Sequence, residues 1–543
     1  MEDLKEKPPI FMEATDESGV TVDPAPAEGL HRKLNNRQVQ LLAIGGSVGT
    51  ALFVTIGNAL AAGGPASLLI AFTLYSALLA CVNNCTAELT VYQPVAGGFI
   101  QFAGKWFDDA LGFMVGWNFF LYEALMVPFE ISAINLLLQY WSDDIPVPAV
   151  LLNALAVGVF GEAEFWLSIG KVLLIFILMF FTFVTMVGGN PQGEAYGFRY
   201  WKDPGAFAEY RSQGSLGRFE GFLKALWTAS FSLVGPEYIC MAAAEAQRPR
   251  IVLKSAFKTI YWRFMLFFIA GAICVGIVVP WDDPTLQAIL MGEASPAGAN
   301  ASPYVIAMSN MRIDGLPHLV NALLLTSIFS AGNMLTFCAT RSLYGLALAG
   351  RAPSFFTKTW RGVPIYAFGL VICFPFLSFL QVSSSSAMVI NWLVSLITAG
   401  ALIDYLVICI TYINFYNACK VQGFDRRTLP YVGYFQPYCA WIGIFFLTAI
   451  LLFYGYSAFG PATVSGFFQN YTMQILAPVL YFGWKFAKKT RIVRPAELDL
   501  VWQAPKVDAY EATFTEEMPG FWVEILQMFR IKRKVHTGKQ DGA

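Results

Sequence analysis

The sequence predicts an all-α polytopic membrane protein with twelve transmembrane helices. Its 543 residues are 56% hydrophobic and only 13% charged, whereas soluble domains carry roughly 25% charged residues. Apolar runs of about 20 residues recur along the chain, and each is long enough to cross a hydrocarbon core of ~30 Å. Basic residues gather in alternate connections between these runs, as in a chain that crosses a membrane repeatedly.

The first 38 residues are polar, and we expect them to form a disordered cytoplasmic tail. Twelve spans follow, of which the fourth is the shortest. They cover residues 39–61, 65–91, 111–140, 147–161, 165–187, 222–245, 258–280, 317–349, 364–382, 387–413, 438–459 and 463–485. Residues 486–543 are predicted to form a cytoplasmic C-terminal tail, in which 521–529 carry an apolar helical face. Such a helix suits the inner leaflet, a partner protein or the protein's own cytoplasmic face.

The basic residues predict that both termini are cytoplasmic. The connections after spans six, eight, ten and twelve are rich in Lys and Arg, and such connections remain on the cytoplasmic side. The alternate short connections are acidic or neutral. The basic residues are Arg248, Arg250, Lys254, Lys258, Arg351, Lys358, Arg361, Lys420, Arg426, Arg427, Lys485, Lys488, Lys489, Arg491 and Arg494.

The first span contains AIGGSVGTALF, residues 43–53, which is rich in residues that weaken a helix. Unwound backbone is tolerated in a membrane where it is buried in protein or lines a cavity. The N–H groups at the start of the second half-helix would then suit a carboxylate. Small residues that allow close helix packing are the alternative interpretation.

The sixth span has a similar interruption in FSLVGPE, residues 231–237. Proline removes a backbone donor and disturbs the preceding turn. Interrupted helices at corresponding positions of two five-helix halves indicate a five-plus-five inverted-repeat transporter core with a substrate site between broken helices 1 and 6. On this interpretation residues 39–485 are the transporter domain, with repeats 39–187 and 222–413 and peripheral helices 11 and 12 in 438–485.

Ionisable residues within spans are candidates for function, because each costs roughly 2.5–3.5 kcal/mol to insert. Glu88 favours a structural pairing at the inner end of span two. Glu130 faces either a cavity or a packed interface. Lys171 is either a snorkelling side chain or an amine that carries a proton or replaces a cation. Asp404 has no evident basic partner, and its role stays open.

Cysteine and histidine usage argues against an enzyme, a disulfide framework and a metal site. The nine cysteines are scattered singly and only three histidines are present. No nucleophile–base pair, metal cluster or phosphate-binding loop is recognisable. We therefore expect no cofactor, with the proton as coupling ion, and no nucleic-acid partner.

Several motifs carry a resemblance to a known family. They include AIGGSVGTALF, AELTVYQPVAGGF, GWNFFLYEALMVPFEISAINLLLQYW, EFWLSIGKVLLI, SFSLVGPEYICMAAAEAQRPR and CKVQGFDRRTLPY. In this order, over about residues 34–485, the chain resembles the fungal amino-acid permeases, the yeast amino-acid transporter family of the amino acid–polyamine–organocation superfamily. The resemblance implies ten core helices in two inverted repeats, two peripheral helices and proton-coupled amino-acid uptake across the plasma membrane by alternating access.

The resemblance also implies roles for residues. The first break would hold the substrate α-carboxylate, and the second the α-amino group, with Phe231 as an aromatic gate. Lys171, at the position of a sodium ion in related transporters, and Glu237 are the proton-coupling candidates. The candidate substrate-binding residues are Gly46, Ser47, Val48, Gly49, Thr50, Glu130, Phe231, Ser232, Leu233, Glu237 and Asn333.

Departures from the family pattern leave the side-chain preference open. Ala51 replaces a glycine, Pro236 a small polar residue, and Tyr412 and Asn414 a frequent His and Arg. Besides the amino acid, protons and membrane lipid, trafficking or ubiquitination machinery is an expected partner of the tails. The alternative functions are a non-transporting amino-acid sensor and a transporter of choline, polyamine or another amine.

Overall fold

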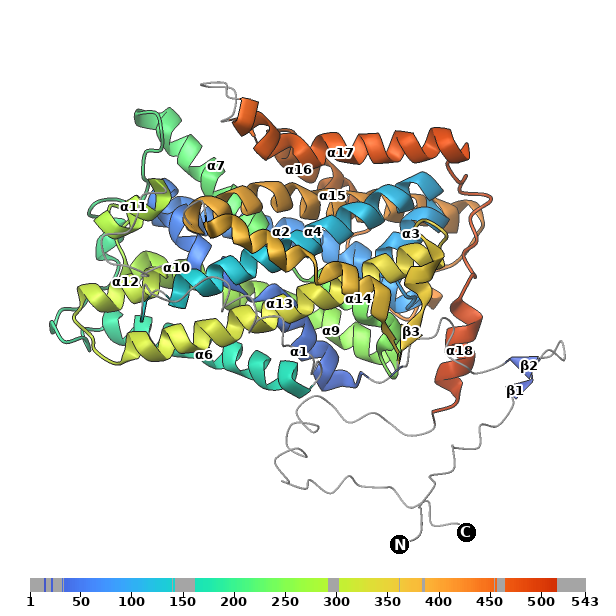
Figure 1. Cartoon of the computed structure of the whole chain (residues 1–543), viewed down its shortest axis with the longest axis horizontal. Coiled ribbons are helices and arrows are strands. Elements are labelled where there is room, and N and C mark those ends of the chain that lie inside the picture. Colours follow the sequence, from blue (N-terminus) through green and yellow to red (C-terminus); the bar gives the residue numbers. More distant parts are fainter. Residues whose placement is uncertain are drawn as a thin grey trace, which may run out of the picture.

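Long helices, running side by side, make up most of the computed structural model (Figure 1). It describes residues 14–15, 21–22, 32, 34–138, 140–141, 162–291, 302–360, 362–382, 386–453, 455–456 and 464–514. The strands are short antiparallel pairs: β1 (Ala14–Thr15) with β2 (Thr21–Val22), and β3 (Thr359–Trp360) with β4 (Val363–Pro364).

The first half of the chain forms the helices that surround the first break. They are α1 (Asn36–Ser47), the π-helix η1 (Ala51–Thr55), α2 (Ile56–Tyr92), α3 (Gly98–Trp106), α4 (Asp109–Leu138) and α6 (Glu162–Met186). The capping box of Asn35 and Gln38 fixes the start of α1. The expected boundary between spans one and two lies inside α2, where Gly64 forms a kink with φ +76°.

The second half begins with α7 (Gly214–Ser232) and α8 (Pro236–Ala242), the two parts of the sixth span. The other elements are η2 (Arg199–Trp201), in the connection before α7, and those after α8, which include short helices in the outer connection and long apolar ones. Those after α8 are η3 (Ala243–Glu245), α9 (Pro249–Arg263), η4 (Phe264–Ile269), α10 (Ala270–Val278), α11 (Pro284–Met291), α12 (Pro303–Asn310), α13 (Leu316–Leu348), η5 (Ser354–Thr357), α14 (Ile365–Val371), η6 (Phe374–Val382), α15 (Ser386–Val421), η7 (Arg426–Thr428), α16 (Tyr438–Phe453), α17 (Val464–Lys488) and α18 (Ala504–Ala512).

Among the described residues, six helical stretches are long and apolar enough to span a membrane. They are Ala51–Tyr92, Asp109–Leu138, Leu167–Met186, Pro249–Val278, Leu316–Leu348 and Leu393–Val421. The predicted fourth span, 147–161, and the apolar tail segment 521–529 lie outside the described residues. The protein is thus a multi-pass helical membrane protein.

Two helices extend beyond the approximate limits of the expected spans. α7 starts at Gly214, before 222, and α15 continues to Val421, beyond 413. Neither extension is a continuous apolar run, so hydropathy gives only a weak signal for them although the helix continues. The ninth span is a short α-helix, α14, followed by the 3-10 helix η6.

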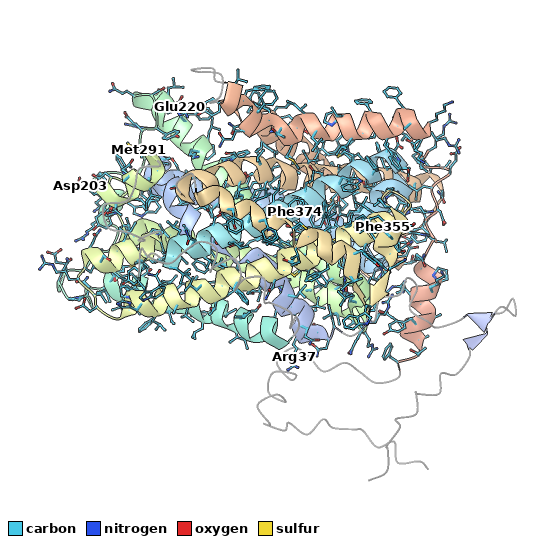
Figure 2. All side chains as sticks on the ribbon, in the orientation of Figure 1. Arg37, Asp203, Glu220, Met291, Phe355 and Phe374 are labelled. Atoms are coloured by element: carbon cyan, nitrogen blue, oxygen red, sulfur yellow. The ribbon has the colours of Figure 1, made fainter. Side chains whose placement is uncertain are left out.

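The two ends of the helical bundle differ in what they carry. Figure 1 shows α7, α11 and α12 toward one end, and α3, β3 and α18 toward the other. In Figure 2, Asp203, Glu220 and Met291 lie at the first end, whereas Phe355 lies near the second. The connections predicted to be extracellular and those predicted to be cytoplasmic therefore gather at opposite ends.

Part of the C-terminal tail packs on the helical core. The Nε1 of Trp106 donates to the carbonyl of Asp499 at 2.9 Å, and Nε2 of Gln93 to that of Leu500 at 2.8 Å. In α18, Asp508 forms an ion pair with Arg250 of α9. Residues 493–511 thus connect the ends of α2, α3 and α9, which sequence analysis did not predict.

Candidate functional site

The chain leaves the first helix within the predicted stretch. α1 ends at Ser47, Val48 is extended (φ −118°, ψ 98°), and the chain becomes helical again in η1. The hydroxyl of Ser47 donates to the carbonyl of Ala43 at 2.8 Å. A Cβ on Gly49 would lie only 3.0 Å from both Ala331 Cβ and Glu130 Oε1, so the absence of a side chain allows α4 and α13 to approach the break.

The second break follows the same plan. α7 ends at Ser232, Leu233 is extended (φ −93°, ψ 108°), and α8 begins at Pro236. Proline suits this first helical position, where its missing N–H would have no partner within the helix. The N–H of Gly235 donates to Oε2 of Glu237 at 3.1 Å.

The two breaks lie side by side. α1 packs against α8, and η1 packs against α7. A Cβ on Gly46 would lie 2.7 Å from Cδ2 of Tyr238, and the hydroxyl of Ser232 donates to the carbonyl of Ala51 at 3.3 Å. The C-terminal end of one half-helix therefore meets the N-terminal end of another at both breaks. Carbonyls and N–H groups left free by helix ends can bind both charges of a zwitterion.

Two ionisable side chains contact the first break directly. Thr50 Oγ1 donates to Oε2 of Glu130 at 2.5 Å. Lys171 Nζ donates to the carbonyl of Gly45 at 2.5 Å, and the Lys171 side chain is fully buried. The amine lies at the break and not at the membrane interface, so the structure does not support the snorkelling interpretation.

Phe231 is buried beside the second break. Its ring is 4% exposed and packs edge-to-face against Phe129 of α4, with centroids 5.3 Å apart. The ring contact joins α7 to α4 beside the second break.

Asn333 is near Glu130 but not at the breaks. Both residues line a cavity of about 340 Å³ between α4, α13, α14 and the β3–β4 hairpin. Residues 46–50 and 231–233 do not line this cavity. The structure therefore groups the candidate residues into a break region and a neighbouring cavity, with Glu130 common to both.

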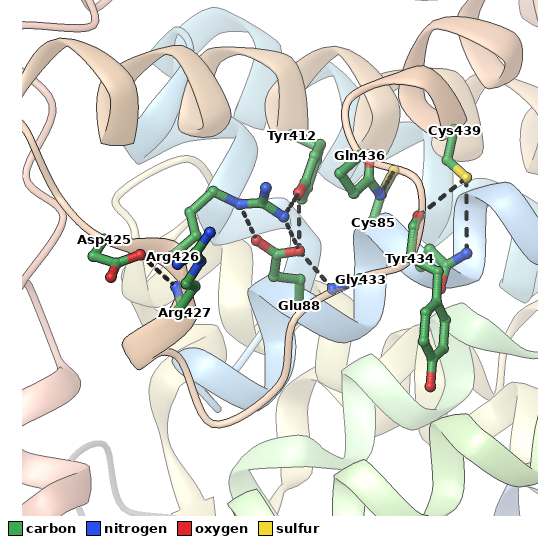
Figure 3. A network of polar contacts seen from close by, with 11 residues as sticks. Cys85, Glu88, Tyr412, Asp425, Arg426, Arg427, Gly433, Tyr434, Gln436 and Cys439 are labelled. Atoms are coloured by element: carbon green, nitrogen blue, oxygen red, sulfur yellow. Dashed lines mark hydrogen bonds and ion pairs between the residues drawn. The ribbon is translucent and has the colours of Figure 1, made fainter.

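Glu88, Tyr412 and Asn414 lie in hydrogen-bond networks away from the two breaks. The carboxylate of Glu88 accepts hydrogen bonds from Arg426 (2.8 Å), from the hydroxyl of Tyr412 (2.9 Å) and from the N–H of Gly433 (2.8 Å), as Figure 3 shows. Asn414 donates to the carbonyls of Trp106 and Val493. Glu88 is thus structural, as expected, and Tyr412 belongs to its network and not to either break.

Sequence analysis missed Glu123. Its side chain is fully buried on α4, and Asp404 nearby accepts a hydrogen bond from Asn118 at 2.9 Å. Glu123 precedes Glu130 by seven residues, a spacing that places both on one helical face. The sequence signal that could have identified Glu123 is a pair of acids seven residues apart within one apolar span.

Known proteins with similar sequences agree on the family. A family model described as Amino acid permease matches residues 38–496. The General amino acid permease AGP2 of Saccharomyces cerevisiae is 44% identical over 501 residues, covering 88% of this chain and 83% of that protein. A proline-specific permease of Emericella nidulans is 36% identical over 508 residues, covering 91% and 92%. A probable lysine/arginine permease of Candida albicans, CAN2, is 34% identical over 466 residues, covering 84% and 80%.

The names of these relatives differ in side-chain preference, so their shared sequence features cannot encode one particular side chain. All are named as permeases, which are transporters and not enzymes. The chain therefore belongs to the amino-acid permease family, among its fungal members.

Proposed function

We propose that this protein is a proton-coupled amino-acid symporter that takes up its substrate across the plasma membrane by alternating access. The observation that carries the proposal is the pair of breaks placed side by side, α1–η1 against α7–α8. A free amino acid has a carboxylate and an ammonium group a few ångströms apart, and the paired helix ends offer both N–H groups and carbonyls.

In this proposal the start of η1 receives the α-carboxylate. The backbone of Gly46, Ser47, Val48 and Gly49 surrounds this position. The N–H of Val48 already donates to the carbonyl of Ile44, so the donors are the N–H groups that open η1, from Gly49 onward, where the positive end of the helix dipole adds to the attraction. The carbonyls that end α7, at Phe231, Ser232 and Leu233, receive the α-amino group. Phe231 acts as the gate.

Lys171 links the substrate site to protons. Its amine is held against the carbonyl of Gly45, one residue before the proposed carboxylate-binding backbone. A change in its charge or position would therefore act on the first break directly. Glu237, whose carboxylate accepts the N–H of Gly235 at the second break, is the corresponding candidate there.

The orientation and symmetry are part of the proposal. The connections with basic residues gather at the end that carries α3 and α18, which favours cytoplasmic termini. Breaks in the first and sixth spans favour twelve spans with a five-plus-five inverted-repeat core. Plasma-membrane uptake would place the tails within reach of trafficking machinery.

Substitution at Gly46 tests the substrate site. Gly46→Leu places a side chain where a Cβ alone would lie 2.7 Å from the Tyr238 ring, so binding and uptake of amino acids should be lost. The matched control is Gly483→Leu, because no atom lies within 4 Å of a Cβ at Gly483. The measurement is binding and uptake of radiolabelled amino acids by purified protein in liposomes. Unchanged affinity in Gly46→Leu would place the carboxylate elsewhere.

A further inference from the structure

Glu123 is a buried acid without a hydrogen-bond partner. Its side chain has 0% exposure, and among the described residues neither carboxyl oxygen has a donor within bonding distance. Burying an ionised carboxylate without a partner is far more costly than burying its neutral form. The same holds within a membrane-spanning segment, where charges are tolerated when paired or hydrated.

The surroundings of Glu123 make the ionised form still less favourable. Glu237 and Asp404, from α8 and α15, lie close enough for their charges to act on it. In the part of the chain that the structure describes, no ion pair includes any of these three acids. The titratable groups within electrostatic range of these acids include Tyr75, Tyr122, Tyr238, Cys240, Cys338 and Tyr405.

The other two acids are partly satisfied. Glu237 accepts the hydroxyl of Tyr405 at 2.8 Å as well as the N–H of Gly235. One oxygen of Asp404 accepts from Asn118, and the other has no partner among the described residues. Of the three acids, Glu123 is therefore the one for which the protonated form is most favoured over the carboxylate.

A separate observation comes from Tyr238. Its side chain is fully buried, lies within electrostatic range of Glu123 and is within hydrogen-bonding reach of Tyr122. A hydroxyl and a carboxylic acid can each donate and accept, so the pair can accommodate a proton that is shared or moved between neighbours.

The geometry limits the size of the occupant. The described residues contain no group of three or more His, Cys, Asp and Glu arranged to hold a metal ion. Among the described residues, Glu123 is not part of the lining of the cavity of about 340 Å³ beside Glu130. A proton fits where an amine or a hydrated ion would require additional space.

We propose that Glu123 is a proton-binding residue of the transport cycle, with its carboxyl protonated in this conformation. The inference rests on the proposed function and extends it. Glu123 lies on the same face of α4 as Glu130, about 10 Å along the helix, toward the end of α4 that begins at Asp109. Its proton lies between the breaks and the end of the bundle that carries α3 and α18.

The step is a simple proton transfer. When the inner side opens and water reaches Glu123, its O–H bond breaks and the proton passes to that water, leaving a carboxylate. In the next cycle the carboxylate takes a proton from the outer side while the substrate binds. No oxidant, reductant or metal takes part.

Infrared spectroscopy of the full-length protein in liposomes tests the proposal without knowledge of the substrate. The probe is the proton itself, exchanged for deuterium, and the signal is the carbonyl stretch of a protonated carboxyl group. We expect Glu123→Gln to lose a band that the wild type shows at neutral pH. Glu209→Gln is the control, because Glu209 is exposed beside Arg218 and should not contribute to that band. A Glu123→Gln spectrum identical to that of the wild type would overturn the proposal.

Two further measurements keep the test decisive. If Glu123→Gln does not fold, Glu123→Asp retains a carboxyl one methylene shorter and should shift the band; an unshifted band overturns the proposal. In transport assays, Glu123→Gln should lose gradient-driven accumulation at least tenfold and retain substrate exchange, whereas full accumulation would remove Glu123 from coupling. Absence of all transport in the wild type would refute the proposed function instead, and the infrared result would still stand.

Discussion

Removing the Arg426 side chain should destabilise the protein, because it leaves the buried carboxylate of Glu88 with an unpaired charge. Arg426 approaches Glu88 through two nitrogens, each 2.8 Å from a carboxyl oxygen, and the Glu88 side chain is fully buried (Figure 3). Burial lowers the pKa of Arg426, but the hydrogen bond and charge of Glu88 and the neighbouring tyrosines raise it above its usual value. The guanidinium therefore stays charged throughout the accessible pH range.

The magnitude follows from what remains around Glu88. Breaking a buried ion pair by removing one partner costs about 3–5 kcal/mol. Two of the donors to Glu88 survive in Arg426→Ala, the Tyr412 hydroxyl and the Gly433 N–H, so we expect the low end of this range, about 3 kcal/mol. Adding Glu88→Gln removes the buried charge and should recover about 1–2 kcal/mol of that loss.

The assay is thermal unfolding of the four proteins of a double-mutant cycle in one detergent. Arg426→Ala should have the lowest apparent Tm, and the double variant should unfold at a higher temperature than Arg426→Ala alone. Arg427→Ala is the matched control, since Arg427 is exposed in the same turn. Additive effects of the two substitutions, or an equal loss in Arg427→Ala, would refute the reasoning.

Other regions of the molecule give independent predictions. Lys171→Ala should abolish pH-driven accumulation and leave some exchange, measured by flux in liposomes; unchanged concentrative uptake would remove Lys171 from the mechanism. Gly64→Ala should lower the apparent Tm, because Gly64 has φ +76° and a Cβ would lie 2.7 Å from the backbone nitrogen of Ala208; such strain costs about 1–3 kcal/mol. Ending the chain after residue 489 should also lower the apparent Tm, because Gln93 and Trp106 lose buried acceptors, at about 1–3 kcal/mol each; an unchanged Tm would mean that the docked tail does not stabilise the core.

The breaks could be predicted from the sequence because their causes are local. Gly45, Gly46 and Gly49 weaken a continuous helix, and Pro236 starts a helix where no N–H is needed. Both effects depend on residue type and near neighbours. The same is true of the apolar spans, whose length and hydropathy are properties of short segments.

The remaining features depend on contacts between distant segments. Lys171 could equally have reached the interface, and only the fold places its amine at the carbonyl of Gly45. Tyr412 was considered for substrate preference, whereas its hydroxyl bonds Glu88, 324 residues away. Residues of three helices, α4, α8 and α15, surround Glu123. The sequence of α4 alone does not indicate which acids of α8 and α15 lie near it.

The most direct test of the account measures uptake of all twenty amino acids by the purified protein in liposomes, with and without an inward proton gradient. We predict that a subset of amino acids accumulates only when the gradient is present, and that Gly46→Leu abolishes this accumulation. Binding without uptake, in correctly folded protein, would contradict transport and indicate a sensor. Uptake restricted to amines that lack a carboxylate would contradict the carboxylate site at the first break.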